Sequence, residues 1–292
     1  MQTADGTDNS PADRSRAVPA VHDPDGRDPA GRDLAADLAV ALQIADRCDE
    51  LTMSRFGALD LVVESKPDLT PVTDADQATE RLIRARLGEV RPDDVVSGEE
   101  FDTTGSGDWR WVLDPIDGTK NFVRGVPVWA TLIGLLHGDD AVLGVVSAPA
   151  LGRRWWGHAG GGAWASALGS TPRRLHVSAV SDLADASLSF SSLDGWATRD
   201  RGAALLDLGA KVWRSRGYGD FWSYMLLAEG AVDLAAEPEL SLWDIAAVAP
   251  IVVEAGGTFT GLNGRPGVHH GNAAASNGTL HAALLEALGR AD

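Results

Sequence analysis

The sequence predicts an α/β protein whose helical layers alternate with mixed, largely antiparallel sheets. Segments with apolar residues at helical spacing, at 34–56 and after residue 73, alternate with short apolar runs of β-forming residues. Two of these runs, at 129–136 and 141–148, flank a short polar turn and predict an antiparallel hairpin. At 292 residues the chain has room for one large domain or two smaller ones.

The N-terminal part, residues 1–33, is predicted to be a disordered tail. It is rich in Asp, Pro, Gly, Arg and Ala, and it cannot bury enough apolar surface to offset the entropy lost on ordering. The first amphipathic helix should follow at 34–56. Its buried stripe is expected to consist of Leu34, Leu38, Leu42, Ala45 and Met53.

A loop that contains Lys66 leads into a second helix, which carries Leu82, Ile83 and Leu87. Thr73 and Asp76 have the spacing of a capping box, in which Asp76 would only satisfy backbone donors. A short strand at 95–97 then ends at the acidic pair Glu99 and Glu100. Such a pair by itself usually lies on a solvated face, so its position at a strand end is the informative feature.

The segment 109–125, WRWVLDPIDGTKNFVRG, carries the strongest local signal. Its apolar start predicts a buried strand that ends at Asp114 and Asp117, and Pro115 restricts the backbone so that both carboxylates stay near one point. Gly118 permits an unusual φ, and Thr119 can open a short helix with free N–H groups. Hard oxygen ligands beside N–H donors suit a divalent cation that bridges to a phosphate. The alternative interpretation is an Asp-Pro turn followed by an Asp-Gly turn, because loops contain both dipeptides routinely.

The rest of the chain continues the alternation of strands and helices. A helix is expected from 243 to 254, stopped by two glycines, and Asp244 in its first turn is favoured by the helix dipole alone. Helices are also expected at 220–229 and 280–288. Strands are expected at 154–156, 160–165, 175–177, 188–192, 212–214, 231–236, 258–260 and 273–276, with a polar crossover between the fourth and fifth of these.

Composition excludes several classes of function. A formal net charge of −17 argues against a nucleic-acid surface, which needs clustered Lys and Arg. The single cysteine, Cys48, excludes an intramolecular disulfide, and no P-loop motif is present. Because no apolar run approaches the roughly 18–20 residues of a membrane span and no signal pattern opens the chain, we expect a cytoplasmic protein without membrane partners.

Taken together, the acidic segments resemble the inositol monophosphatase-like, magnesium-dependent, lithium-sensitive phosphatases. The matching stretches are GEE at 98–100, DPIDGT at 114–119, and WD followed by EAGG within 243–257. Their order and spacing fit, and the resemblance covers nearly everything from residue 34 onward. It implies one catalytic domain at 34–292, folded as a five-layer αβαβα sandwich, and a homodimer.

The resemblance also implies a site with two or three Mg²⁺ ions. Glu99, Asp114 and the backbone carbonyl of Ile116 would hold one ion. Asp114, Asp117 and Asp244 would hold a second, and Glu99 a weaker third. Mg²⁺ prefers such oxygen ligands and keeps several waters.

The catalytic roles implied by the resemblance fall on Glu99, Thr119 and Asp76. Thr119 would orient the attacking water and donate its hydroxyl hydrogen bond to Asp76. The N–H groups of Gly118 and Thr119 would hold phosphoryl oxygens. Lys66 aligns with a lysine near the family's site, but a solvated loop lysine is the favoured interpretation from the sequence.

More finely, DPIDGTKNFVRGVPVWA, YGDF at 218–221 and AAEPELSLWD at 235–244 resemble the histidinol-phosphate phosphatase branch of the family. This branch implies a role in histidine biosynthesis. Asp220 and Glu237 would bind the cationic substrate beside Asp244, although Asp220 could instead be a helix N-cap. Inositol-1-phosphate phosphatase, bisphosphate nucleotidase and a non-catalytic scaffold are the alternatives.

Overall fold

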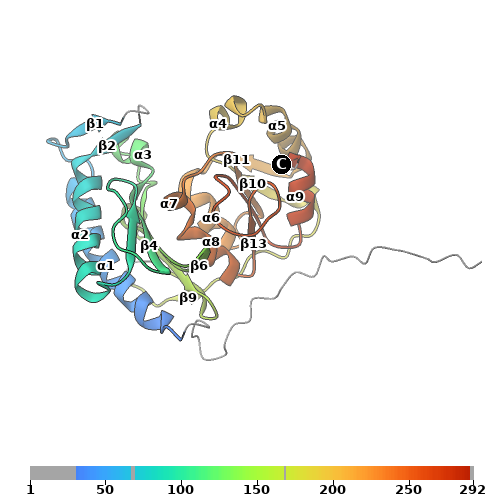
Figure 1. Ribbon diagram of the computed structural model, residues 1–292. Coiled ribbons are helices and arrows are strands. Elements are labelled where there is room, and N and C mark those ends of the chain that lie inside the picture. Colours follow the sequence, from blue (N-terminus) through green and yellow to red (C-terminus); the bar gives the residue numbers. More distant parts are fainter. Residues whose placement is uncertain (1–30, 67–69, 168, 290–292) are drawn as a thin grey trace, which may run out of the picture.

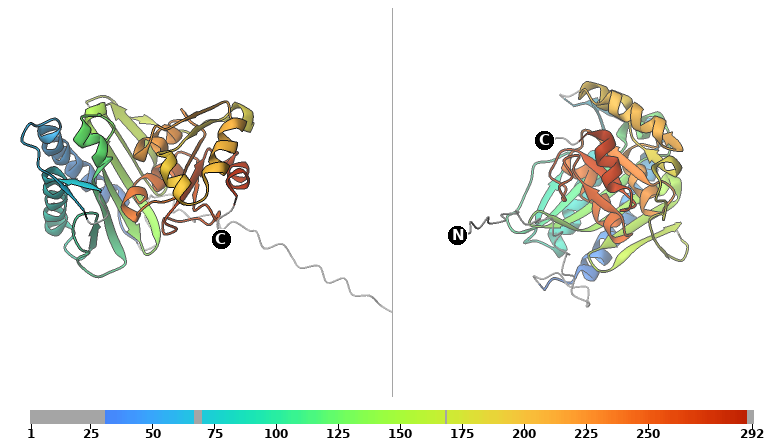
Figure 2. Two further views of the ribbon diagram at one scale, coloured as in Figure 1. Left: turned by 90° about the horizontal axis from the view of Figure 1, so that it is seen from above. Right: turned by 90° about the vertical axis from the view of Figure 1, so that its right-hand side faces the viewer.

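The computed structural model describes residues 31–66, 70–167 and 169–289. Within these ranges the chain forms five layers in the order helix, sheet, helix, sheet, helix, which run from left to right in Figure 1 and are seen from above in Figure 2. The predicted αβαβα sandwich is therefore confirmed. In the described part of the chain, no helix is long and apolar enough to cross a membrane.

The first two layers are a helix pair and a seven-stranded sheet. Helices α1 (Leu34–Arg55) and α2 (Asp74–Val90) pack on one face of this sheet. Its strands, in spatial order, are β3 (Val95–Gly98), β4 (Trp109–Asp117), β5 (Ala130–His137), β6 (Asp140–Ala148), β7 (Arg153–His158), β8 (Gly162–Ala167) and β9 (Arg173–Arg174). Strands β3 and β4 are parallel, and the other pairs are antiparallel.

The middle layer consists of helices enclosed between the two sheets. It contains α6 (Asp220–Ala228), α7 (Leu242–Ile245) and α8 (Val248–Glu254). Side chains alternate along β4, so that Trp111 and Leu113 pack against the first helical layer while Val112 packs against the middle one. Most side chains of this layer are apolar and buried because sheets cover both of its faces, while Asp220 and Asp244 lie at helix starts that border a cavity.

The second sheet has five strands and is covered by the last helical layer. In spatial order the strands are β11 (Arg214–Arg216), β10 (Ser187–Ser189), β12 (Leu234–Glu237), β14 (Ala273–Ser276) and β13 (Thr258–Thr260). The helices are α4 (Leu193–Thr198), α5 (Gly202–Lys211) and α9 (His281–Leu288). The short elements are β1 (Val63–Ser65), β2 (Pro71–Thr73), α3 (Thr119–Arg124), and the 3₁₀ turns η1 (Pro149–Leu151) and η2 (Leu183–Asp185).

Two predictions about helices were incomplete or wrong in detail. The polar crossover predicted between β10 and β11 contains two helices, α4 and α5, that the sequence analysis did not identify. The buried leucines Leu205 and Leu208 lie on one face of α5. The helix predicted at 243–254 is divided into α7 and α8. Pro250 lacks the N–H group that would bond to the carbonyl of Ala246, so the ladder is interrupted there.

Two smaller predictions were also wrong, and one strand pair was missed. The strand expected at 175–177 is instead β9 at Arg173–Arg174, and the antiparallel pair of β1 and β2 was not predicted. The side chain of Met53 does not belong to the buried stripe of α1, because it is 43% exposed. The inward face near that end of the helix carries Cys48 and Thr52 instead.

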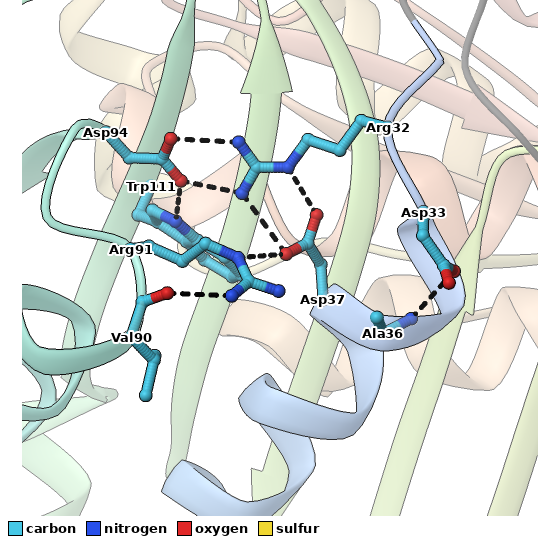
Figure 3. Close-up of polar contacts among 8 residues, drawn as sticks. All are labelled: Arg32, Asp33, Ala36, Asp37, Val90, Arg91, Asp94 and Trp111. Atoms are coloured by element: carbon cyan, nitrogen blue, oxygen red, sulfur yellow. Dashed lines mark hydrogen bonds and ion pairs between the residues drawn. The ribbon is translucent and has the colours of Figure 1, made fainter.

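An ionic cluster attaches the start of α1 to α2 and to the large sheet (Figure 3). The guanidinium of Arg32 binds both carboxylate oxygens of Asp94, at 2.8 and 2.6 Å, and also binds Asp37. Asp37 accepts a further bond of 2.6 Å from Arg91, and Asp94 accepts one of 2.8 Å from the indole of Trp111. The end of the predicted tail is thus part of the folded protein, whereas residues 1–30 lie outside the described residues.

Candidate metal centre and substrate pocket

Three carboxylates from two distant segments meet at the end of β4. One oxygen from each of Asp114, Asp117 and Asp244 lies within 4.8 Å of the others. The pairing of β4 with β5 is irregular between Asp114 and Asp117, which lets both side chains reach this point. Asp244 arrives from α7, where it belongs to a capping box with Ser241. The structure thus brings together three of the predicted metal ligands.

Each of these carboxylates keeps an oxygen for a ligand. The backbone N–H of Phe221 donates to Asp117 Oδ2 at 2.7 Å, and that of Ser241 donates to Asp244 Oδ2 at 2.7 Å. Asp114 Oδ1 is buried and has no hydrogen-bond partner within the described part of the chain. A buried, unpaired carboxylate oxygen costs free energy, which a hard cation offsets. The donor set therefore fits a divalent cation that prefers oxygen ligands.

The electrostatics of the cluster agree with this fit. Burial, followed by the nearby charges of Glu99, Asp117 and Asp244, raises the pKa of Asp114 well above its usual value. Burial also raises the pKa of Asp244 to about 7. Without a cation these groups repel one another and retain protons, so metal binding should release protons.

These shifts predict how the stability of the metal-free protein changes with pH. Burial raises the pKa of Asp244 to about 7 and that of Glu237 to about 8, both above the unfolded values near 4. Between these limits the folded state binds more protons than the unfolded chain, so the free energy of unfolding falls as pH rises. We expect the melting temperature in EDTA to be about 5 °C lower at pH 8.5 than at pH 6, with a smaller drop in Mg²⁺. A melting temperature that rises over this range in EDTA would contradict the assignment.

Glu99 lies in the same cavity but is not one of the three closely spaced carboxylates. Its Oε1 accepts a bond of 2.6 Å from Lys66 Nζ, which also binds Glu100 at 2.8 Å. The interpretation of Lys66 as a solvated lysine was wrong, since its side chain is only 20% exposed and lines the cavity. Lys66 thus supplies a positive charge at the edge of the cluster.

The start of α3 borders the carboxylates. Gly118 has φ +84°, and a Cβ atom there would lie 3.0 Å from the carbonyl oxygen of Val128, so only glycine fits without displacement. The hydroxyl of Thr119 lies 3.0 Å from the carbonyl oxygen of Ile116 and 3.3 Å from Asp76 Oδ1. The predicted pair of Thr119 and Asp76 is therefore within hydrogen-bond distance.

Asp76 makes both of the contacts considered from the sequence. It completes the predicted capping box of α2, because the N–H of Thr73 donates to its Oδ2 at 2.8 Å. Its other oxygen faces Thr119. Burial raises the pKa of Asp76 to about 6, against the opposing effect of the Thr73 hydrogen bonds. The carboxyl group is consequently ionised above this pH and can accept a hydrogen bond from a neighbouring hydroxyl.

A cavity of about 860 Å³ extends from the carboxylates to Asp220 and Glu237. Asp220 does not cap its helix, because Gly219 occupies the N-cap position without a side-chain bond. Asp220 instead adopts φ +49°, a conformation that costs on the order of 1–3 kcal/mol in a residue other than glycine. Its carboxylate accepts a bond of 3.2 Å from the amide of Asn121. The helix N-cap interpretation was therefore wrong, and the strain directs a carboxylate toward α3.

Glu237, at the end of β12, is the second acidic group beyond the metal cluster. It is 5% exposed, and one of its oxygens accepts the N–H of Ser191. The hydroxyl of Ser191 accepts the N–H of Asp220 at 2.8 Å, so one residue fixes both acidic groups. The sequence analysis identified neither Ser191 nor Asn121 as a residue that holds these acidic groups, because their partners Glu237 and Asp220 lie far from them in the sequence.

The chain is similar to known proteins over almost its whole length. A model described as the inositol monophosphatase family matches residues 33–291. Sequence identity is 61% over 257 residues to a histidinol-phosphatase of Streptomyces coelicolor, covering 87% of this chain and 97% of that protein. Sequence identity is 59% over 254 residues to a histidinol-phosphatase of Mycobacterium tuberculosis, covering 86% of this chain and 97% of that protein.

A solved structure confirms the fold. The extragenic suppressor protein suhB from Bartonella henselae matches with a TM-score of 0.79 at 29% identity, covering 88% of this chain and 100% of that chain. The range matched by the family model includes every residue of the carboxylate cluster and the cavity.

Proposed function

This chain belongs to the inositol monophosphatase family, and from that premise we propose that it is a phosphomonoesterase that converts L-histidinol phosphate and water to L-histidinol and phosphate. This reaction would place it in histidine biosynthesis. The observation that carries the proposal is the cavity itself, which joins a carboxylate cluster that could hold a metal ion to two further acidic groups suited to a cationic substrate. The two relatives at 61% and 59% identity support the same substrate.

Asp114, Asp117 and Asp244 would hold Mg²⁺, with Glu99 and the carbonyl of Ile116 completing a set for two or three ions. Bound Mg²⁺ supplies Lewis acidity that activates the attacking water and stabilises the leaving alcohol oxygen. The N–H groups of Gly118 and Thr119 lie at the start of α3 and would bind phosphoryl oxygens.

Thr119 and Asp76 would position the attacking water. The hydroxyl of Thr119 has one proton to donate, and Asp76 is an ionised acceptor 3.3 Å away. Donation to Asp76 leaves a lone pair of Thr119 free to accept a hydrogen bond from water. Water would then attack phosphorus in line, without a covalent phosphoenzyme.

Recognition of the substrate is proposed to depend on Asp220 and Glu237, with Asp244 at the boundary of the metal cluster. A cationic ligand would offset the cost of keeping two acidic groups in one partly buried cavity. A polyol could hydrogen-bond to Glu237 but offers no positive charge to Asp220. The proposed substrate therefore uses both groups.

An Asp220→Asn substitution tests this recognition. We expect kcat/KM for histidinol phosphate to fall about 10- to 100-fold, the effect of losing one hydrogen bond to a charged group, with a much smaller change for inositol phosphate. The matched control is Glu239→Gln, which removes an exposed charge at the rim of the same cavity. Equal losses on both substrates, or an equal loss in the control, would remove Asp220 from substrate recognition.

The decisive experiment for the function compares phosphate release from L-histidinol phosphate and from myo-inositol 1-phosphate, each with and without Mg²⁺. The proposal predicts Mg²⁺-dependent release from the first substrate and little from the second. A preference for myo-inositol 1-phosphate would support the Mg²⁺-dependent phosphatase reaction and contradict the proposed role in histidine biosynthesis. Release from neither would favour a bisphosphate nucleotidase or a non-catalytic scaffold.

Three further properties are proposed on the family resemblance. The protein should be a homodimer, measurable by light scattering, and cytoplasmic, measurable by cell fractionation. Li⁺ should inhibit turnover in competition with activation by Mg²⁺. A monomer, a membrane-bound fraction or full activity in Li⁺ would each contradict the corresponding proposal.

A further inference from the structure

The turn at 98–100 carries Glu99, which lines the same cavity as the three clustered carboxylates. Pairing with β4 fixes one side of this turn, since Gly98 lies opposite Leu113 and the N–H of Glu99 donates to the Leu113 carbonyl at 3.2 Å. Strand pairing leaves the other side, at Glu100 and Phe101, without a partner in β4. That side is held by two residues of α2.

Glu80 on α2 is the first of these residues. Its side chain is fully buried, and its Oε2 accepts the N–H of Glu100 at 2.8 Å. A Cβ atom on Gly98 would lie 2.0 Å from Glu80 Oε1, so the carboxylate occupies the space that a side chain would fill. Glycine at this position thus lets Glu80 contact the turn directly.

Arg84, one helical turn later, is the second. It binds Glu80 Oε1 at 2.7 Å and donates to the carbonyl oxygens of Phe101 at 2.9 Å and Val96 at 3.3 Å. The ion pair therefore contacts backbone on both sides of Glu99. An exposed ion pair at this helical spacing would contribute little to stability. Here the carboxylate of Glu80 is fully buried, and its two oxygens accept hydrogen bonds from Arg84 and from the N–H of Glu100.

We propose that Glu80, held by Arg84, is a positioning residue that fixes the turn at 98–100 and so keeps Glu99 at the metal centre. It acts through Glu99 and contacts neither the metal nor the substrate. This inference rests on the proposed function, because it assigns Glu99 to the metal. Helix α2 then serves the site twice, through Asp76 near its start and through Glu80 one turn later.

The test substitutes Glu80 by glutamine, which keeps the size and an acceptor for the Glu100 N–H but cannot accept from Arg84. Loss of a residue that orients a metal ligand typically weakens metal affinity 10- to 100-fold. In the substrate-free Glu80→Gln protein we expect the weakest site to bind Mn²⁺ about tenfold less tightly than in the wild type. The paramagnetic signal of free Mn²⁺ measures this binding. The Mg²⁺ concentration for half-maximal activity should rise by a similar factor, with KM at saturating Mg²⁺ changed less than twofold.

The matched control is Glu89→Gln, which makes the same change on the same helix, in an exposed pair with Arg86. The inference is overturned if folded Glu80→Gln protein retains the wild-type Mn²⁺ affinity, or if the control loses as much. If Glu80→Gln does not fold, the same measurements are made on Glu80→Asp. This variant keeps the negative charge but moves the carboxylate away from Arg84 and from the N–H of Glu100. Wild-type protein that binds Mn²⁺ without hydrolysing either phosphate would overturn the proposed function and leave the Mn²⁺ comparison valid.

Discussion

Replacing Asp114 by asparagine is expected to lower kcat by at least about 10³-fold at any Mg²⁺ concentration and to weaken metal binding. Asp114 is buried, and its Oδ1 has no hydrogen-bond partner among the described residues. Asparagine would present a neutral amide to the position where we propose that cations are held. Steady-state phosphate release over a range of Mg²⁺ concentrations, together with Mn²⁺ titration, measures both effects.

The same substitution should not destabilise the metal-free protein. Burial and the surrounding negative charges raise the pKa of Asp114, so the ionised side chain is unfavourable when no cation is bound. The melting temperature in EDTA at pH 8 should therefore stay equal or increase, while the stabilisation by Mg²⁺ disappears. Asp140→Asn, an exposed change on the same sheet, is the control and should alter neither property. Near-normal activity of Asp114→Asn at saturating Mg²⁺ would refute its role as a ligand.

The local part of the site could be predicted from the sequence because a few neighbouring residues determine it. An apolar run that ends at Asp114 and Asp117, with Pro115 between them, already specifies a strand end with two carboxylates. The capping box of Thr73 and Asp76 is likewise a matter of spacing. The helix containing Asp244 could be predicted, but its approach to the other two carboxylates depends on how α7 packs in the middle layer.

Contacts between distant segments could not be predicted in this way. Lys66 was expected to be a solvated loop lysine, yet its side chain binds Glu99 and Glu100, which follow β3 and lie far from it in the sequence. Asp220 has the sequence features of a helix N-cap, but in the structure it has a positive φ and its N–H donates to the hydroxyl of Ser191, a residue distant in the sequence. Helix α4 spans only six residues, too few to show a helical period.

Removing the hydroxyl of Thr119 is expected to have the second largest effect. For Thr119→Ala we expect kcat to fall about 10²- to 10³-fold, the usual contribution of a group that positions a proton in the transition state. The Mg²⁺ requirement and KM should change little, because the carboxylates that would hold the ions are unchanged by this substitution. Steady-state kinetics on histidinol phosphate and Mn²⁺ binding measure these quantities separately.

Thr119→Ser is the control, because it keeps the hydroxyl that lies 3.3 Å from Asp76 and removes only a methyl group. It should retain kcat within about tenfold of the wild type, since serine can restore the hydrogen bond at some cost in side-chain order. Asp76→Asn should share the defect of Thr119→Ala, and combining the two should add little, because the two groups act as one unit. If alanine and serine at position 119 behaved alike, the hydroxyl would have no part in positioning the water. Additive losses in the double variant would show that Thr119 and Asp76 do not act as one unit.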